Sequence, residues 1–243
     1  MKQNFFCLML AIVLAASGAY AQSVEEKIEN ENVVLGEIIK DGKSTIGYIK
    51  MMYAYDDGSV YPAPWQYQSD IRFIPKEDFE KAEKIKNKMY EKYDAKDIDG
   101  YKYDTLVYES VKYADMSAVG TGMIAKKMFM QKILDDKISL YYHYDSPPAV
   151  VSGETFASYY IECAKPHLVY QVGDEGKLKL VNDMNVEKEL ADCPDVVTKY
   201  KNGEYEALKS NGEASGANKL LNKVLFREGV RKMVIEDYNK SCK

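Results

Sequence analysis

The chain has 243 residues, with 33 lysines and arginines against 38 acidic residues and a formal net charge of −5. The basic residues are spread along the chain, which excludes the concentrated positive surface that nucleic-acid binding needs. The 21 tyrosines outnumber the 7 phenylalanines and the single tryptophan. This composition is typical of half-buried β-strands, and aromatic platforms for carbohydrate use tyrosine too.

The first 21 residues have the pattern of a secretory signal peptide. Lys2 precedes an apolar run from Phe5 to Ala16, and Ala19-Tyr20-Ala21 supplies a small-residue cleavage site. The apolar run is short for a membrane span, although an uncleaved anchor is the alternative. We expect cleavage after Ala21, export to the periplasm or the cell surface, and no membrane span in the mature chain.

A β-hairpin is predicted directly after a polar and acidic lead-in over residues 22–32, which we expect to be flexible, either disordered or weakly helical. Asp41-Gly42 separates two apolar, β-branched runs, and this dipeptide is typical of a two-residue hairpin turn. The strands are placed near residues 33–40 and 43–53. A loop rich in proline and glycine follows, and then a short strand that ends at Pro75.

A surface helix is predicted over residues 76–93. The segment is strongly charged, and its apolar residues recur at helical spacing along one narrow stripe. They are Phe79, Ala82, Ile85, Met89 and Tyr93.

The remaining pattern divides into strands and then helices. Alternating apolar and polar residues predict several strands up to residue 180, with a turn at Asp135-Asp136. From residue 181 the spacing becomes helical, and Pro194 stands at a first helical position. We therefore expect a β-rich α+β fold, with an antiparallel sandwich-like or barrel-like body over residues 33–180 and a C-terminal helical element over residues 181–243.

Known catalytic and metal-binding motifs fail when they are compared with the sequence. The segment around Asp99-Gly100 resembles a calcium loop, but Ala95 and Leu106 occupy the two positions that need carboxylates. There is no Gly-x-Ser-x-Gly nucleophile motif. Acidic pairs are frequent, and solvated turns explain them. We expect no catalytic residue, no bound metal and no cofactor.

One strand offers a weak candidate for a ligand-binding face. If alternation holds, Tyr141, His143 and Asp145 point to the same side of it. A histidine and an aspartate at this spacing could supply two metal ligands, but a metal site needs a third. His167 follows Pro166 and is expected in a loop.

Three cysteines remain after removal of the signal segment: Cys163, Cys193 and Cys242. An exported protein keeps disulfides, and three cysteines allow one. Cys193 begins one predicted helix and Cys242 follows the last one, so an antiparallel helix pair would bring them together. We favour Cys193–Cys242 over Cys163–Cys193, with Cys163 left as a buried strand residue. Closing a loop of about 50 residues stabilises a fold by about 4 kcal/mol in the chain-entropy model.

Four segments carry a resemblance to other proteins: "GEIIKDGKSTIGYIK", "YDAKDIDGYKY", "KISLYYHY" and "LADCPDVV" with the closing "DYNKSC". Together they resemble a loose group of uncharacterised secreted envelope proteins of Bacteroidota. The lysine-rich segment 76–93 departs from that pattern. The resemblance implies an envelope location and a β-rich fold, supports the pairing of Cys193 with Cys242, and supplies no catalytic residue.

The sequence leaves three functions open. We expect a non-enzymatic envelope or surface protein that binds or supports a partner, either an envelope protein or a glycan. The first alternative binds a small apolar or glycan ligand through tyrosines, and needs a cavity of roughly 300 Å3 or more. The second is a hydrolase, which needs two facing carboxylates, one with a raised pKa.

Overall fold

The computed structural model describes residues 22–56, 59–114, 125–146, 160, 163–210 and 219–242. The predicted signal peptide over residues 1–21 lies outside the described residues. None of the helices in the described ranges is long and apolar enough to cross a membrane.

Ten strands form one antiparallel sheet. They are β1 (Val33–Lys40), β2 (Lys43–Lys50), β5 (Asp70–Pro75), β6 (Glu91–Asp94), β7 (Gly100–Tyr103), β8 (Leu106–Tyr113), β9 (Lys126–Leu134), β10 (Ile138–His143), β11 (His167–Val172) and β12 (Lys179–Leu180). Their order across the sheet is β12-β11-β10-β9-β8-β7-β1-β2-β5-β6. A separate hairpin pairs β3 (Tyr53–Asp56) with β4 (Ser59–Pro62). The β-rich α+β class is confirmed, and the ten-stranded sheet is open rather than closed into a barrel.

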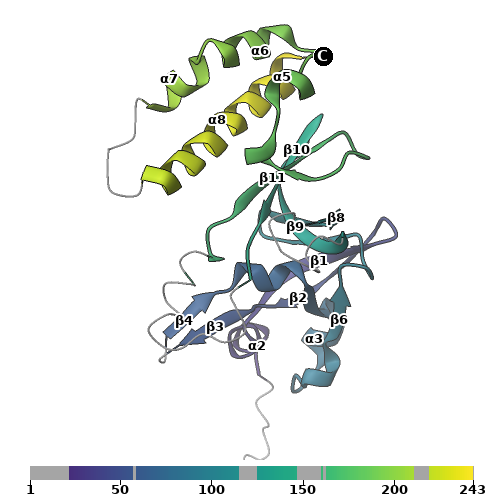
Figure 1. Cartoon of the computed structure of the whole chain (residues 1–243). Coiled ribbons are helices and arrows are strands. Elements are labelled where there is room, and N and C mark those ends of the chain that lie inside the picture. The colour runs from purple at the N-terminus through teal and green to yellow at the C-terminus, as the bar shows by residue number, and fades with distance from the viewer. Residues whose placement is uncertain are drawn as a thin grey trace, which may run out of the picture.

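The helices lie at two ends of the molecule. They are α2 (Val24–Glu31), α3 (Lys76–Lys81), α5 (Val186–Glu189), α6 (Pro194–Lys201), α7 (Glu204–Ser210) and α8 (Lys219–Ser241), with 3-10 turns η1 (Pro64–Gln68), η2 (Asn87–Met89) and η4 (Val181–Asp183). Figure 1 shows α5 to α8 gathered beyond β10 and β11, and α2 and α3 at the opposite end.

The first hairpin forms as its turn residues predict. Asp41 and Gly42 both have positive φ, 50° and 70°, which the right-handed twist of a two-residue hairpin requires. Lys40 pairs with Lys43 across the turn. The second strand ends at Lys50, three residues before the predicted end, and Met51 and Met52 leave the sheet.

The helix predicted over residues 76–93 is wrong beyond its first turns. Helix α3 ends at Lys81, and Ala82 is extended with ψ 131°. The buried Lys27 ammonium donates to the carbonyl oxygens of Glu80 and Ala82, at 3.0 and 2.6 Å, and so satisfies groups at the helix end. Tyr93 lies in β6 opposite Ile71. Apolar contact and strand pairing therefore override the helical spacing.

The lead-in takes the helical alternative, because residues 24–31 form helix α2 with a defined N-cap. Ser23 caps this helix: its hydroxyl accepts from the Glu26 amide, and the Glu26 carboxylate accepts from the Ser23 amide, both at 3.1 Å. This reciprocal capping box satisfies donors that a helix start otherwise leaves open.

The C-terminal helices pack on one face of β10 and β11. The shared core joins strand residues to helix residues, and it includes Ile138, Leu140, Leu168, Tyr170, Val181, Val196, Val234 and Ile235. The Asn239 side chain fixes α8 to the sheet, because it bonds both the amide and the carbonyl of Ile138, at 3.0 and 2.8 Å.

Cys193 and Cys242 lie at disulfide distance, as predicted, with Cα atoms 5.9 Å apart. The bond joins the start of α6 to the end of α8. Cys163 lies outside it and is buried, but it stands in a helical turn rather than in the expected strand.

Candidate functional site

Two cavities lie on opposite faces of strands β8 and β9. Successive side chains of a strand point to opposite faces, so Tyr108 and its register partner Gln131 share one face. Their neighbours Glu109 and Lys132 form an ion pair on the other face. We call the first the tyrosine face and the second the polar face.

The cavity on the tyrosine face, the tyrosine pocket, has a volume of about 380 Å3. Half of its lining residues are tyrosines. The lining consists of Met51, Met52, Tyr53, Pro64, Tyr67, Tyr103, Leu106, Tyr108, Gln131, Tyr144, Tyr160 and Ala164. None of these side chains carries a charge at neutral pH.

Strands β7 and β8 build the floor of the pocket. Tyr101 pairs with Tyr108 across the strands, and their rings stack at 4.6 Å with an interplanar angle of 7°. Tyr103 and Tyr108 lie 6.0 Å apart at 13°. The Tyr101 hydroxyl donates to the Tyr67 carbonyl at 2.8 Å. The Tyr101 and Tyr108 rings therefore face one another, and the Tyr101 hydroxyl points toward η1.

Turn η1 forms one wall and is tied to the end of β10 by a buried amide. Gln68 donates to the Tyr144 carbonyl and accepts from the Tyr144 amide, both at 2.7 Å. The Gln68 side chain is 3% exposed. It bonds both backbone groups of Tyr144, in the way that a residue of a neighbouring strand bonds its partner. The Tyr67 hydroxyl accepts from the Met52 amide at 2.9 Å, which holds residues 51–53 against the same wall.

A small apolar cluster supports the wall next to Tyr160. It contains Ala63, Trp65 and Cys163, with Tyr144 and Tyr160 packed against it. The Trp65 and Tyr160 rings meet edge to face with centroids 5.6 Å apart.

Four of the pocket tyrosines are held in their protonated form. Burial raises the pKa of Tyr67, Tyr103 and Tyr108, and it raises the pKa of Tyr144 to about 12. Because desolvation disfavours the phenolate, each hydroxyl can donate as well as accept a hydrogen bond at neutral pH.

Several polar groups of the pocket are not engaged by any described residue. The hydroxyls of Tyr53 and Tyr144 and the amide of Gln131 have no hydrogen-bond partner among the residues that the structure describes. The hydroxyls of Tyr103 and Tyr108 bond to each other. The pocket thus combines apolar walls with open donors and acceptors.

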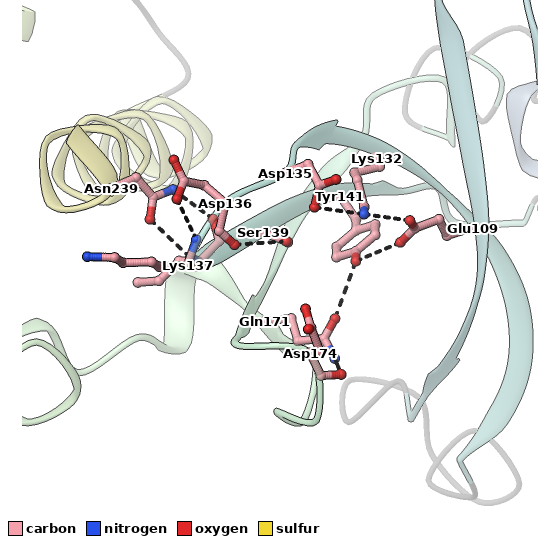
Figure 2. Close-up of polar contacts among 11 residues, drawn as sticks. Glu109, Lys132, Asp135, Asp136, Lys137, Ser139, Tyr141, Gln171, Asp174 and Asn239 are labelled. Carbon is pink, nitrogen blue, oxygen red and sulfur yellow. Dashed lines mark hydrogen bonds and ion pairs between the residues drawn. The ribbon is translucent and has the colours of Figure 1, made fainter. Parts of the chain in front are cut away.

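The polar face carries a cavity of about 440 Å3, and several of its lining groups form a hydrogen-bonded network (Figure 2). The Tyr141 hydroxyl lies 3.0 Å from the Glu109 carboxylate and 3.3 Å from the Gln171 amide oxygen. Lys132 pairs with Glu109 and, at 2.9 Å, with Asp135. Gln171 donates to two backbone carbonyls at 2.9 Å.

The charges of this network are mutually stabilised. Burial alone would lower the pKa of Lys132, but its hydrogen bonds to Glu109 and Asp135 raise it. Burial and then the Glu109 charge raise the pKa of Tyr141. Lys132 therefore stays a cation and Tyr141 stays neutral at physiological pH.

The structure places the predicted ligand-face residues close together without forming a metal site. Tyr141 lies in the polar network, and His143 is the register partner of His167 in β11. His167 was expected in a loop, but it begins this strand and bonds Asp145 at 2.9 Å. The His167 hydrogen bond lowers the pKa of Asp145. Among the described residues, no three His, Cys, Asp or Glu side chains are grouped as a metal site.

One carboxyl group has the raised pKa expected of a general acid, but its position is structural. Burial raises the pKa of Glu228 in α8. Its carboxylate accepts the Leu168 amide of β11, and Asn182 lies 3.5 Å from its other oxygen. Glu228 lines neither of the two cavities.

No family model, curated protein sequence or solved structure matches this chain. The resemblance to secreted proteins of Bacteroidota therefore stays a prediction.

Sequence reasoning missed the tyrosine pocket, although one signal was present. Tyr101, Tyr103 and Tyr108 flank a short turn in which Asp104 has a positive φ of 50°. Alternation in a hairpin around this turn would place the three rings on one face. Tyr67 could not be added to them, because it comes from a segment predicted to be a loop.

Proposed function

We propose that the protein is an exported, non-enzymatic binding protein that takes a small apolar or glycan ligand in the tyrosine pocket. The cavity volume of about 380 Å3 with six lining tyrosines carries this proposal. It falls within the range of small-molecule sites, roughly 300–1,000 Å3, which combine apolar walls with a few placed polar groups.

Export is proposed on two grounds. The N-terminal sequence has the signal-peptide pattern, and Cys193 and Cys242 lie at disulfide distance. Disulfides persist in oxidising compartments and are rare in the cytosol. Mass spectrometry of the secreted protein without reductant should find Gln22 as the first residue and Cys193 linked to Cys242. An intact N-terminus, or two thiols at these positions, would contradict the proposal.

A binding role is favoured over catalysis by the state of the charged groups. Glu109 and Lys132 both line the cavity of the polar face and form an ion pair, and Glu109 also accepts a hydrogen bond from Tyr141. A general acid or base has to reach a substrate, and these groups already have partners.

Ligand binding can be tested with a library of small sugars, aromatics and fatty alcohols. A ligand that binds only the folded state raises the melting temperature of the mature chain. Trp65 is the only tryptophan of the chain and contacts Tyr160, so its fluorescence reports on the pocket wall.

Two glutamines on opposite faces provide the matched variants. Gln131→Ala should weaken binding, because Gln131 lines the pocket, whereas Gln171→Ala on the polar face should leave the affinity unchanged. The proposal fails if no library member binds, or if both variants weaken binding equally.

A second candidate, contact with an envelope partner, rests on one exposed apolar pair. Leu35 in β1 and Ile46 in β2 are 47% and 57% exposed on the same face of neighbouring strands. Replacing both with lysine should abolish cross-linking to a partner in intact cells without changing the melting temperature. Unchanged cross-linking would remove this candidate.

A further inference from the structure

We infer that the ligand of the tyrosine pocket is a neutral carbohydrate, or a closely related polyol, rather than an apolar or a charged molecule. This inference rests on the proposed function and narrows it. Three features of the lining carry it: the open polar groups, the absence of charge and the direction of the tyrosine rings.

The open polar groups disfavour an apolar ligand. The hydroxyl of Tyr144 and the amide of Gln131 line the pocket without a partner in the described part of the chain. An apolar ligand would take water away from them and offer no hydrogen bond in return, which is unfavourable for each group. A ligand with several hydroxyl groups replaces those waters bond for bond.

The absence of charge disfavours an anion. Among the described residues, no lysine, arginine or histidine lines the pocket. A carboxylate or phosphate in the pocket would lose its hydration without gaining a cationic partner. The tyrosine hydroxyls stay neutral, because burial raises the pKa of Tyr67, Tyr103 and Tyr108.

The direction of the rings disfavours a quaternary ammonium ion. Such a cation binds over the faces of aromatic rings. Here the Tyr101 ring stacks on the Tyr108 ring at 4.6 Å and covers one of its faces, and the Tyr103 ring lies within 13° of parallel to both. What the floor offers to a ligand is the edges and hydroxyls of Tyr103 and Tyr108.

A sugar ring matches what the walls supply. Its C–H groups can lie against Met51, Pro64 and Leu106, while its hydroxyls reach Gln131 and Tyr144. Tyrosine serves both ends of such a contact, because one part of the side chain is apolar and the other is polar.

The test is a calorimetric titration of the mature chain with a matched panel. The probes are neutral disaccharides such as maltose, lactose and cellobiose, a disaccharide in which one unit is a uronic acid, choline, and 1-decanol. We expect binding of a neutral disaccharide and at least tenfold weaker binding of the uronic acid counterpart. Tighter binding of choline or decanol, or equal affinity for the uronic acid, would overturn the inference.

Two hydroxyl deletions near the end of β10 test whether the ligand binds in the tyrosine pocket or elsewhere. Tyr144→Phe removes one open hydroxyl and should weaken sugar binding about three- to tenfold, the effect of one lost hydrogen bond. Tyr141→Phe removes a hydroxyl from the polar face and should change the affinity less than about twofold. Equal losses in both variants would contradict the assignment of the site.

The outcomes for the two proposals are distinguishable. If choline or decanol binds and no sugar does, ligand binding stands and the carbohydrate inference fails. If no probe binds and the wider library gives no shift in melting temperature, both fail.

Discussion

The two faces of strands β8 and β9 are built from the same segments, and they treat their polar groups in opposite ways. On the polar face, Glu109 pairs with Lys132 and accepts a hydrogen bond from Tyr141, whose hydroxyl also bonds Gln171. On the tyrosine face, the Tyr144 hydroxyl and the Gln131 amide have no partner within the described residues. Polar groups that bond to one another stabilise the fold, whereas open polar groups can bond a ligand.

The largest expected effect is unfolding at high pH, which should occur if the tyrosine face is buried and should not occur if it is exposed. Burial raises the pKa of Tyr67, Tyr101, Tyr103 and Tyr108 above that of unfolded tyrosine, which is about 10. A group whose pKa is raised in the folded state contributes stability below its unfolded pKa, and this contribution is lost as the pH rises above that value. We expect cooperative unfolding between about pH 10 and 12, which removes several kcal/mol of stability.

This transition can be followed by tyrosinate absorbance and circular dichroism together. Both signals should change at the same pH, because the buried tyrosines ionise only when the chain unfolds. Full tyrosinate absorbance near pH 10 with a native dichroism spectrum would show that the tyrosine face is open to solvent. This result would contradict the contrast drawn between the two faces.

The next effect concerns the cation of the polar face. Lys132→Met should lower the free energy of unfolding by about 2 kcal/mol at pH 7, because Glu109 loses its partner in a half-buried position. The ion pair of Lys132 with Asp135 contributes little to this change, because Asp135 is mostly exposed. Urea denaturation measures the change.

The matched control is Lys127→Met on the same strand. The Lys127 ammonium is exposed and has no ion-pair partner among the described residues, so its loss should change the free energy of unfolding by less than about 0.5 kcal/mol. Equal effects of the two substitutions would mean that the polar face is not held by its internal bonds.

A smaller effect compares two hydroxyl deletions near the end of β10. Tyr141→Phe should cost about 1 kcal/mol, because it removes hydrogen bonds to Glu109 and Gln171. Tyr144→Phe should be neutral within about 0.5 kcal/mol, because its hydroxyl has no hydrogen-bond partner in the described part of the chain. Thermal unfolding of both variants measures the two changes in stability. A larger loss of stability for Tyr144→Phe than for Tyr141→Phe would contradict the contrast between the two faces.

The smallest effect is expected from the pair of Asp145 and His167, which lies beyond the polar network. Both side chains are about half exposed, so the pair should contribute less than about 1 kcal/mol. The pKa of Asp145 is lowered in the folded state. Its contribution is therefore present above about pH 4 and lost as the pH falls through the folded value.

Urea denaturation of the wild type and Asp145→Asn at pH 5 and pH 2 tests this dependence. The two proteins should differ slightly at pH 5 and have the same stability at pH 2. A difference that grows toward low pH would contradict the sign of the shift.

Features set by neighbouring residues were predictable from the sequence. The turn at Asp41-Gly42 places the first hairpin, and alternation in β10 places Tyr141 and His143 on one face. The pairing of Cys193 with Cys242 followed from the expected helix ends. Each of these inferences needs only the local backbone period or the direction of two successive helices.

Features set by distant residues were not predictable. The apolar spacing over residues 76–93 is helical, but Lys27 satisfies carbonyls at the end of α3, and β6 pairs with β5. The tyrosine pocket needs Tyr67 from η1 above the strands of a hairpin that begins at Gly100. No periodicity within either segment encodes that contact.

The strand order also has a consequence for the speed of folding. Strands β7 to β12 follow one another in the sheet as they do in the chain, whereas β1 pairs with β7 across about 60 intervening residues. Closing this long loop is the slow kind of step in β-sheet formation. Tyr67 and Met52 lie on one side of that junction, and Tyr108 and Gln131 lie on the other. We therefore expect the two halves of the sheet to form first, so that during refolding the recovery of ligand binding lags behind the recovery of β-structure.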